Sequence, residues 1–229
     1  MNVSVGFTPV DPPEAELAIV IDVLRATSTL CQARASGVAS IVCVAEVEDA
    51  RARAGDGRAL AGERNNVRIP GFDFGNSPRE FAEQPTSPSQ LVFTTTNGTR
   101  LLLAAAARCE TVLVGSLLNL AAVVAAAAAA ASDLVVLCAG VEGRFALDDA
   151  YVAGRIVAAL EATPDDAAVA AMHLAASFPS ALEGIGAGQS AENLRVTGLA
   201  DDIAYCARES VLEVVPRVVE RDGSAVVVA

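Results

Sequence analysis

The sequence predicts an α/β fold in which helices cover both faces of a mainly parallel or mixed β-sheet. Apolar runs of strand length alternate with helical segments from position 17 to position 138, and this alternation is typical of parallel strands joined by crossover helices. Hydrophobic residues make up 53% of the 229 positions and aromatic residues only 4%, so Ala and Val must fill most of the core. These two observations predict a three-layer α/β/α arrangement.

Two parts of the chain share one layout. The first run has predicted strands at 17–23, 40–44 and 58–61, with helices ending near 36 and covering 46–54. The second run has strands at 91–95, 111–114 and 134–138, with helices ending near 107 and covering 119–131. We interpret the runs as two similar βαβαβ halves of one unit spanning 1–229, with 1–85 and 86–229 as candidate lobes.

The remaining segments connect or follow these runs. The segment 62–89 is rich in Gly, Pro, Asn and Arg; a loop of this length is usually functional, and its Phe72 and Phe74 favour an ordered path. After position 148 we predict helices near 149–160, 164–177 and 198–208, with a flexible connection at 184–188. The tail 216–228 alternates about a turn at 221–224 and predicts a hairpin.

The charge of the chain limits its partners. The formal net charge is -12 and the pI is about 4.5, which opposes binding to nucleic acid or to an anionic membrane surface. All 16 basic residues are Arg. A lysine Schiff base and a P-loop lysine are therefore excluded, and an anion site must use guanidinium groups, backbone amides, hydroxyls or a metal.

Other features predict a cytosolic protein. The cysteine count is odd, and no pair is spaced as C-x-x-C, which favours reduced thiols. The N-terminus lacks the layout of a signal peptide, and the apolar stretch 117–131 is shorter than a membrane span. Ala-rich helices and the C-terminal strands are compatible with a homodimer. The cysteines are Cys31, Cys43, Cys109, Cys138 and Cys206.

The first predicted strand leads into a cluster of polar residues. Asp22 and Arg25 follow the apolar run, and the hydroxyls of Thr27 and Ser28 come next, where a helix begins. Ligands bind at the carboxyl ends of strands in open α/β sheets, and a helix N-terminus attracts anions. Asp22 is thus a candidate cation ligand, and the other three are candidate ligands of a phosphate or sulfonate. The alternative is that these residues only cap the helix.

Further acids stand at or beyond the ends of other predicted strands. Glu63 follows the strand at 58–61, and Asp148 and Asp149 follow the strand that ends at Cys138. Mg²⁺ takes carboxylate oxygens and waters, so these acids and Asp22 could converge on one ion; helix caps or surface charges are the alternative. Asp22 could instead be a nucleophile, but Leu24 stands where aspartyl-phosphate enzymes carry their second acid.

Polar turns follow other strands. Thr96, Asn97 and Gly98 come after the strand at 91–95, and Ser116 and Asn119 come after the strand at 111–114. Each turn alone is a good helix cap. If several of them meet at one edge of the sheet, they form an anion cradle.

A second kind of chemistry is also compatible with the sequence. Cys138 precedes Arg144 by six residues after an apolar strand, which is the spacing of cysteine-dependent phosphatases. Leu137 and Glu142 oppose this interpretation, because that class usually has histidine before the cysteine and no acid in the loop. His173, in an Ala-rich helix, is interpreted as a surface or core histidine.

The chain carries several short blocks in this order: DVLRATST at 22–29, GE at 62–63, GFDFGNSP at 71–78, TTNGT at 95–99, GS at 115–116 with Asn119, and CAG at 138–140 with Asp148 and Asp149. Taken in order, these blocks resemble the signatures of the 2-phosphosulfolactate phosphatase (ComB-like) family. The resemblance extends from about 17 to 216 and implies an α/β, Mg²⁺-dependent phosphatase that removes phosphate from 2-phospho-3-sulfolactate on the route to coenzyme M. Two places depart from the family pattern: Asp148 replaces a glutamate, and the region of Asn193 is shorter.

These considerations predict a cytosolic phosphomonoester hydrolase with a bound Mg²⁺. A non-catalytic sensor of a small anion is the alternative that uses the same cradle. The predicted metal ligands are Asp22, Glu63 and Asp149, with Asp148 positioning or activating water. The predicted ligands of the small phosphorylated substrate are Arg25, Thr27, Ser28, Asn76, Ser77, Thr96, Asn97, Gly98, Ser116 and Asn119.

Overall fold

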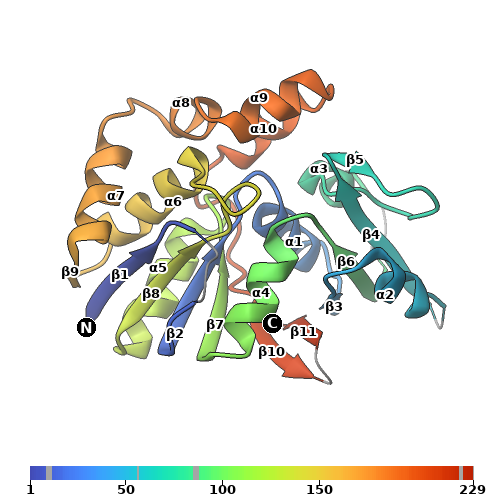
Figure 1. Ribbon diagram of the computed structural model, residues 1–229, viewed down its shortest axis with the longest axis horizontal. Coiled ribbons are helices and arrows are strands. Elements are labelled where there is room, and N and C mark those ends of the chain that lie inside the picture. The colour runs from blue at the N-terminus through green and yellow to red at the C-terminus, as the bar shows by residue number, and fades with distance from the viewer. Residues whose placement is uncertain (9–11, 56, 85–87, 222–223, 229) are drawn as a thin grey trace.

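A computed structural model describes residues 1–8, 12–55, 57–84, 88–221 and 224–228. Within these residues the chain alternates strands and helices and then adds a helical segment and a final hairpin (Figure 1). The strands are β1 (Asn2–Gly6), β2 (Ala15–Ile21), β3 (Ser40–Cys43), β4 (Arg58–Arg64), β5 (Val67–Arg68), β6 (Gln90–Thr94), β7 (Cys109–Gly115), β8 (Leu134–Cys138), β9 (Thr163–Pro164), β10 (Arg217–Arg221) and β11 (Ser224–Val228). The helices are α1 (Ala26–Ala35), α2 (Val47–Ala52), α3 (Pro78–Ala82), α4 (Gly98–Ala106), α5 (Leu120–Ala130), α6 (Leu147–Ala158), α7 (Asp166–Ala176), α8 (Ala181–Gly186), α9 (Gln189–Val196) and α10 (Ala200–Cys206).

The strands form one sheet in which the two predicted runs exchange their first strands. The order is β5-β4-β6-β3-β11-β10-β7-β2-β8-β1-β9. Strand β2 pairs in parallel with β7 and β8 of the second run, and β6 pairs in parallel with β3 and β4 of the first run. We call β4, β6 and β3 the β4 half and β7, β2 and β8 the β8 half. Each half therefore has at its centre a strand from the other run.

The C-terminal hairpin joins the two halves. Strands β10 and β11 pair antiparallel with each other, and β10 pairs antiparallel with β7 and β11 with β3. In a flat sheet the two halves would therefore run in opposite directions, with their carboxyl ends at opposite edges. The right-handed twist that accumulates from strand to strand rotates one half relative to the other. The predicted hairpin is confirmed, while its turn residues Asp222 and Gly223 lie outside the described residues.

The alternation of side chains along each strand places helices on both faces. In β2, Leu17, Ile19 and Ile21 belong to a hydrophobic cluster with residues of α5, α6 and α7 on one face, while Ala18 and Val20 belong to a cluster with residues of α1 and α4 on the other. The α1 and α4 face continues across the hairpin into the β4 half, whose opposite face carries α2. This arrangement confirms the predicted three-layer α/β/α fold with a mainly parallel, mixed sheet.

Two predicted connections are more ordered than the sequence suggested. Strand β4 continues to Arg64 and turns through Asn65 and Asn66 into β5, so Glu63 lies inside a strand instead of after it. The segment 184–188, predicted as flexible, contains the end of α8 and the N-cap of α9, Gly188. A Cβ at Gly184 would lie 2.3 Å from the Tyr151 ring, so this glycine allows α8 to pack closely on α6.

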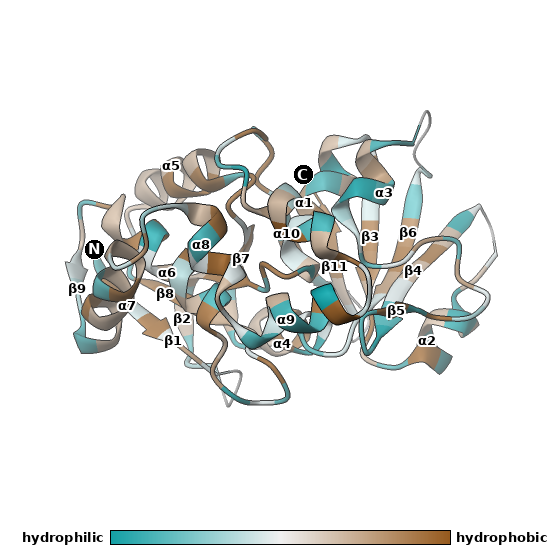
Figure 2. Cartoon of the chain, turned by 90° about the horizontal axis from the view of Figure 1, so that it is seen from above, coloured by the Kyte–Doolittle hydropathy of each residue, from teal (hydrophilic) through white to brown (hydrophobic). Residues whose placement is uncertain are grey.

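The C-terminal helices lie above the junction of the two halves. Seen from above (Figure 2), α9 and α10 lie between α6 and α8 on one side and α3 and β5 on the other. No helix among the described residues has the length and apolar character needed to cross a bilayer.

Candidate active site

A small cavity lies where the turns after β2 and β6 meet the β4–β5 hairpin and α9. Its volume is about 90 Å³, so the enclosed part of a ligand is limited to a small group. Six predicted site residues line it: Asp22, Arg25, Glu63, Asn76, Thr96 and Asn97. The remaining lining residues are Leu24, Asn65, Asn66, Thr95, Val141, Glu142, Ser190 and Asn193.

The turn after β2 (residues 22–25, the β2 turn) is held by its own polar groups. Asp22 Oδ1 accepts the Ala26 N–H at 3.1 Å, and its backbone N–H donates to Thr27 Oγ1 at 3.1 Å. The Thr27 and Ser28 hydroxyls donate back to the carbonyl oxygens of Asp22 and Val23. Asp22 therefore caps the first turn of α1, and the two buried hydroxyls fix the turn instead of facing the cavity.

The turn after β6 (residues 95–97, the β6 turn) packs directly against the β2 turn. A Cβ on Gly98 would lie 2.5 Å from Asp22 Oδ2 and 2.6 Å from the Ala26 Cβ. Only glycine allows this approach without a shift of the backbone. Gly98 thus brings the N-terminus of α4 to the carboxylate at the end of β2.

Glu63 connects the β4–β5 hairpin to the β6 turn. Its Oε1 accepts the Thr96 N–H at 2.9 Å and the Thr96 hydroxyl at 3.1 Å, and its Oε2 accepts the Asn66 N–H at 2.8 Å. Glu63 is buried. Oε1 thus already accepts two bonds, while Oε2 accepts one and keeps acceptor capacity for a ligand.

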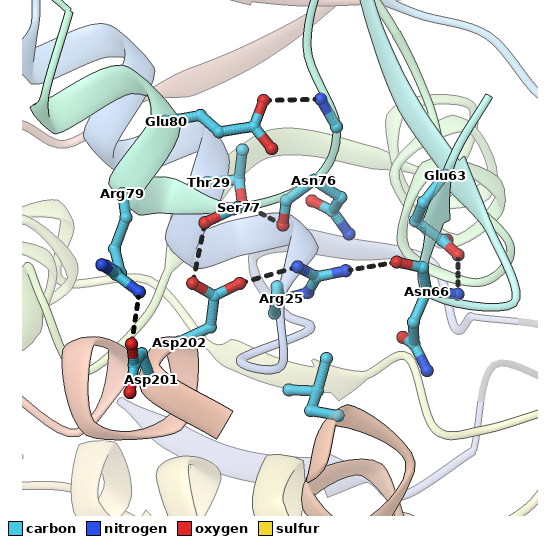
Figure 3. A network of polar contacts seen from close by, with 12 residues as sticks. Arg25, Thr29, Glu63, Asn66, Asn76, Ser77, Arg79, Glu80, Asp201 and Asp202 are labelled. Atoms are coloured by element: carbon cyan, nitrogen blue, oxygen red, sulfur yellow. Dashed lines mark hydrogen bonds and ion pairs between the residues drawn. The ribbon is translucent and has the colours of Figure 1, made fainter. Parts of the chain in front are cut away.

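Arg25 and Asn76 carry buried polar atoms without partners. Arg25 donates through Nη1 to Asp202 Oδ2 at 2.7 Å and through Nη2 to the Asn66 carbonyl at 3.3 Å, as Figure 3 shows. Its Nε and the Asn76 Oδ1 have no hydrogen-bond partner among the described residues. A buried polar atom without a partner is costly. Because both residues line the cavity, a polar ligand there would satisfy these atoms.

Asp148 and Asp149 lie behind the cavity wall. Asp149 Oδ1 accepts the Val23 N–H at 2.9 Å, and its Oδ2 accepts the Gly140 N–H at 3.0 Å, which ties the end of β2 to the end of β8. Asp148 Oδ1 accepts the Ser190 hydroxyl at 2.9 Å. Both acids are buried and neither lines the cavity directly.

Burial dominates the electrostatics of these acids. It raises the pKa of Asp22 to about 7, with the charges of Asp148 and Glu63 adding to the effect and the Ala26 N–H and Arg25 opposing it. Burial likewise raises the pKa of Asp148 to about 6. It also raises the pKa of Asp149 well above its usual value, with help from the charges of Asp148 and Asp22. A nearby cation would favour the charged forms of all three.

Several predicted site residues have side chains committed elsewhere. The Ser77 hydroxyl donates to Asp202 at 2.7 Å. Ser116 donates to Asn119 Oδ1, and the Asn119 amide donates to the carbonyl oxygens of Val114 and Val214. The bonds of Ser116 and Asn119 connect the end of β7 to the C-terminal segment. The side chains of Ser77, Ser116 and Asn119 do not line the cavity.

The arrangement around Cys138 does not match a thiolate site. The thiol is buried, and burial together with the charges of Asp149 and Asp148 raises its pKa well above the usual value. Arg144 is exposed and pairs with Glu142 at 3.1 Å, so it does not close an anion loop around the sulfur. His173 is an exposed residue of α7, as predicted.

A family model described as 2-phosphosulpholactate phosphatase matches residues 7–221. The chain belongs to the 2-phosphosulfolactate phosphatase family. This confirms the resemblance of the sequence blocks and places the chain in a family of phosphoric monoester hydrolases. A relative from Thermotoga petrophila is 37% identical over 219 residues, covering 95% of each chain. A relative from Thermus thermophilus is 35% identical over 217 residues, covering 93% of this chain and 92% of its own; both are named probable 2-phosphosulfolactate phosphatase.

The cavity offers carboxylate oxygens, the ligands that Mg²⁺ prefers. The hydrogen bonds that Asp22 makes among the described residues leave its Oδ2 available. No group of three or more His, Cys, Asp or Glu among those residues could hold a metal ion by itself. Mg²⁺ commonly takes one or two protein carboxylates together with waters and substrate oxygens. The donor set therefore fits an ion that binds with its anionic ligand.

The balance of charge in the cavity supports the same fit. Of its described lining residues, Asp22, Glu63 and Glu142 are acidic and Arg25 is basic. Arg25 is already paired with Asp202. A phosphorylated acid entering this cavity would meet more negative than positive charge, so a divalent cation would favour its binding.

Sequence reasoning missed residues that the tertiary structure adds. Ser190 and Asn193 on α9 line the cavity, and Asp202 on α10 contacts Arg25. Asn65 and Asn66 also line it; their left-handed backbone conformations form the tight turn between β4 and β5. The Asn-Asn pair itself was an available turn signal, whereas Asp202 had no local signal.

Proposed function

We propose that this chain hydrolyses 2-phospho-3-sulfolactate to 3-sulfolactate and phosphate with bound Mg²⁺. The observation that carries the proposal is the cavity where the β2 turn meets the β6 turn, in a chain that belongs to the family over nearly its whole length. The enclosed volume suits the phosphoryl group of a small phosphorylated acid, and the lining offers both anion donors and a free carboxylate oxygen. The relatives named as probable 2-phosphosulfolactate phosphatases support the choice of substrate.

Arg25 and Asn76 are assigned to the phosphoryl group. The unpaired Arg25 Nε–H can donate to a phosphoryl oxygen, and the Asn76 amide can turn its NH₂ toward another. Asn97 accepts the Glu142 N–H through Oδ1, which leaves its NH₂ for the second anionic group. Donors held in fixed positions stabilise the charge that develops on the phosphoryl oxygens.

Asp22 is assigned as the direct ligand of Mg²⁺. Of the two other predicted ligands, Glu63 lines the same cavity, while Asp149 does not line it and is assigned to hold the β2 turn in place. When bound, the ion would polarise a phosphoryl oxygen and lower the pKa of a coordinated water. The ester P–O bond breaks as water attacks phosphorus, and the leaving oxygen takes up a proton from solvent. Asp148 is assigned to accept a proton from the attacking water by way of the Ser190 hydroxyl, which lines the cavity and donates to Asp148 Oδ1 at 2.9 Å. Its pKa, raised by burial to about 6, suits a group that exchanges a proton near neutral pH.

Phosphate release from a panel of small phosphate esters, with Mg²⁺ and with a chelator, tests this proposal. We expect release from 2-phospho-3-sulfolactate that the chelator abolishes. Activity that survives the chelator would remove Mg²⁺ from the mechanism. Binding of the ester without phosphate release would favour the anion sensor.

We also propose that the enzyme works in the cytosol, since its five free, buried cysteines suit a reducing compartment.

A further inference from the structure

Helix α10 carries a buried acid that reaches the β2 turn from 177 positions away in the sequence. Asp202 Oδ2 accepts Arg25 Nη1 at 2.7 Å, and Asp202 Oδ1 accepts the Ser77 hydroxyl at 2.7 Å (Figure 3). The side chains of Arg25 and Asp202 are each 2% exposed. One carboxylate therefore holds the guanidinium of Arg25 and the start of α3 in a fixed relation.

The contacts of Arg25 leave one side of its guanidinium for a ligand. Asp202 occupies Nη1, the Asn66 carbonyl occupies Nη2, and Nε has no partner. An arginine side chain has many rotamers, so a free one would lose entropy on binding an anion. Two fixed contacts reduce that loss before the ligand arrives.

The same acid also acts on Asn76. The Ser77 hydroxyl donates to Asp202. The backbone carbonyl oxygen of the preceding residue, Asn76, accepts a hydrogen bond from the Thr29 hydroxyl of α1 at 3.0 Å. Both residues with unpaired buried polar atoms at the cavity, Arg25 and Asn76, are thus positioned from one network.

Stability alone is a poor explanation for this pair. A buried ion pair loses hydration that its attraction only partly replaces, so it contributes little net stability compared with apolar residues. The neighbouring Asp201 makes the simpler contact, an exposed pair with Arg79 at 3.1 Å, which is of a kind that contributes little. The two adjacent acids of α10 therefore differ in what they contact.

We propose that Asp202 is a positioning residue of the phosphatase site. It orients Arg25 directly, and Asn76 through Ser77, to receive the phosphoryl group. The inference rests on the proposed function, because it assigns these two residues to phosphate.

A matched pair of variants on α10 tests the proposal. Asp202→Asn keeps the shape of the side chain but loses the charge-assisted bond, and we expect KM for the ester to rise about tenfold or more. Asp201→Asn should stay within about twofold of the unchanged enzyme. A KM within twofold in Asp202→Asn would overturn the proposal, and so would a lower KM, which would mean that Asp202 only masks the charge of Arg25.

A double-mutant cycle separates positioning from a purely structural role. In the Arg25→Ala background, Asp202→Asn should cause a much smaller further loss of kcat/KM than in the unchanged enzyme, because only the contact through Ser77 to Asn76 remains. Additive losses would overturn the proposal. If Asp202→Asn does not fold, Ser77→Ala decides the question: removing one contact of Asp202 should raise KM about threefold, and an unchanged KM would count against it.

Binding of inorganic phosphate distinguishes this inference from the proposed function. Calorimetry with the Mg²⁺-loaded protein should show about tenfold weaker phosphate binding in Asp202→Asn. If the unchanged protein hydrolyses no ester, the proposed function fails while this binding comparison still tests Asp202. If it hydrolyses the ester and both proteins bind phosphate equally, only the positioning role fails.

Discussion

The β2 turn and the β6 turn occupy equivalent places in the two halves of the sheet but carry different chemistry. Each follows the central strand of its half and leads into a helix, α1 or α4. The β2 turn contributes Asp22 and Arg25, both charged, whereas the β6 turn contributes Thr95, Thr96 and Asn97, all neutral. The same local architecture therefore supplies ionic groups from one side and hydrogen-bonding groups from the other.

The difference shows why neither half forms the site alone. The β6 turn reaches Asp22 through Gly98 and receives Glu63 of the β4–β5 hairpin through Thr96. The β2 turn donates hydrogen bonds to Asp149 of α6 and Asp202 of α10. The cavity is a junction between the two turns, so changes on the two sides should differ in size and kind.

The largest effect should come from the charged turn. Asp22→Asn removes the carboxylate proposed to bind Mg²⁺ and should lower kcat by about 10³-fold, the scale of a lost transition-state contact. Steady-state assays with a Mg²⁺ titration would measure it, and circular dichroism would check folding. Glu46→Gln, at an exposed acid paired with Arg100, is the control. Retained turnover in Asp22→Asn would remove this residue from the mechanism.

A separation of the two turns should have the next largest effect. A methyl group at Gly98 would lie 2.5 Å from Asp22 Oδ2, so Gly98→Ala should destabilise the fold by about 1–3 kcal/mol and lower kcat/KM. Gly186→Ala, where a Cβ would make only ordinary contacts, is the control. Thermal melting and kinetics would test both, and an unaffected Gly98→Ala enzyme would contradict the close contact between the turns.

The charged turn should also make the metal-free protein sensitive to pH. Burial raises the pKa of Asp22 from 3.8 to about 7, so the folded state keeps a proton that the unfolded state loses. The free energy of unfolding should therefore fall as pH rises from about 4 to 7. Asp22→Asn should flatten this slope, and Mg²⁺ should raise Tm at pH 8 by binding the folded state. Equal slopes in denaturation series of both proteins would contradict the assignment.

The neutral turn should be more tolerant. Thr96→Val removes a hydroxyl that donates to Glu63 Oε1 at 3.1 Å but keeps the backbone donor at 2.9 Å. We expect an increase in KM of about threefold, because one neutral hydrogen bond contributes little. An effect as large as that of Asp22→Asn would abolish the distinction between the turns.

The smallest effect is expected outside both turns. Cys138→Ser should retain full phosphatase activity, since the thiol is buried and burial raises its pKa well above the usual value. Assays of phosphate release and thiol alkylation would test this. Loss of turnover with an intact fold would restore the thiolate alternative.

The strands and helices were predictable where the apolar pattern is local and strong. The predicted strand at 134–138 coincides with β8, and the helix at 119–131 contains α5. The apolar run at 58–61 predicts a strand that is too short, because β4 continues through polar residues to Arg64 and pairs with β5 in a hairpin. The glycines at 184–188 predict a flexible segment, because a glycine that packs on a tyrosine ring, as Gly184 does, looks the same in sequence as one in a loop.

Part of the cavity was predictable because the end of an apolar run is visible in sequence. Asp22, Arg25, Thr96 and Asn97 all follow such runs, and all line the cavity. Ser116 and Asn119 follow one too, but their hydrogen bonds fix β7 and the C-terminal segment. Position after a strand thus predicts a polar turn, but not the partner that the turn meets.

The sequence by itself determined the α/β class, the family and the residue types at the strand ends, because periodicity and short motifs are local properties. The tertiary structure decided which ends meet. It inserted the hairpin of β10 and β11 between the halves and gave each half the first strand of the other run. It also brought Asp202 of α10 into a buried ion pair with Arg25. Strand partners and buried ion pairs depend on contacts between distant segments, and no local pattern encodes them.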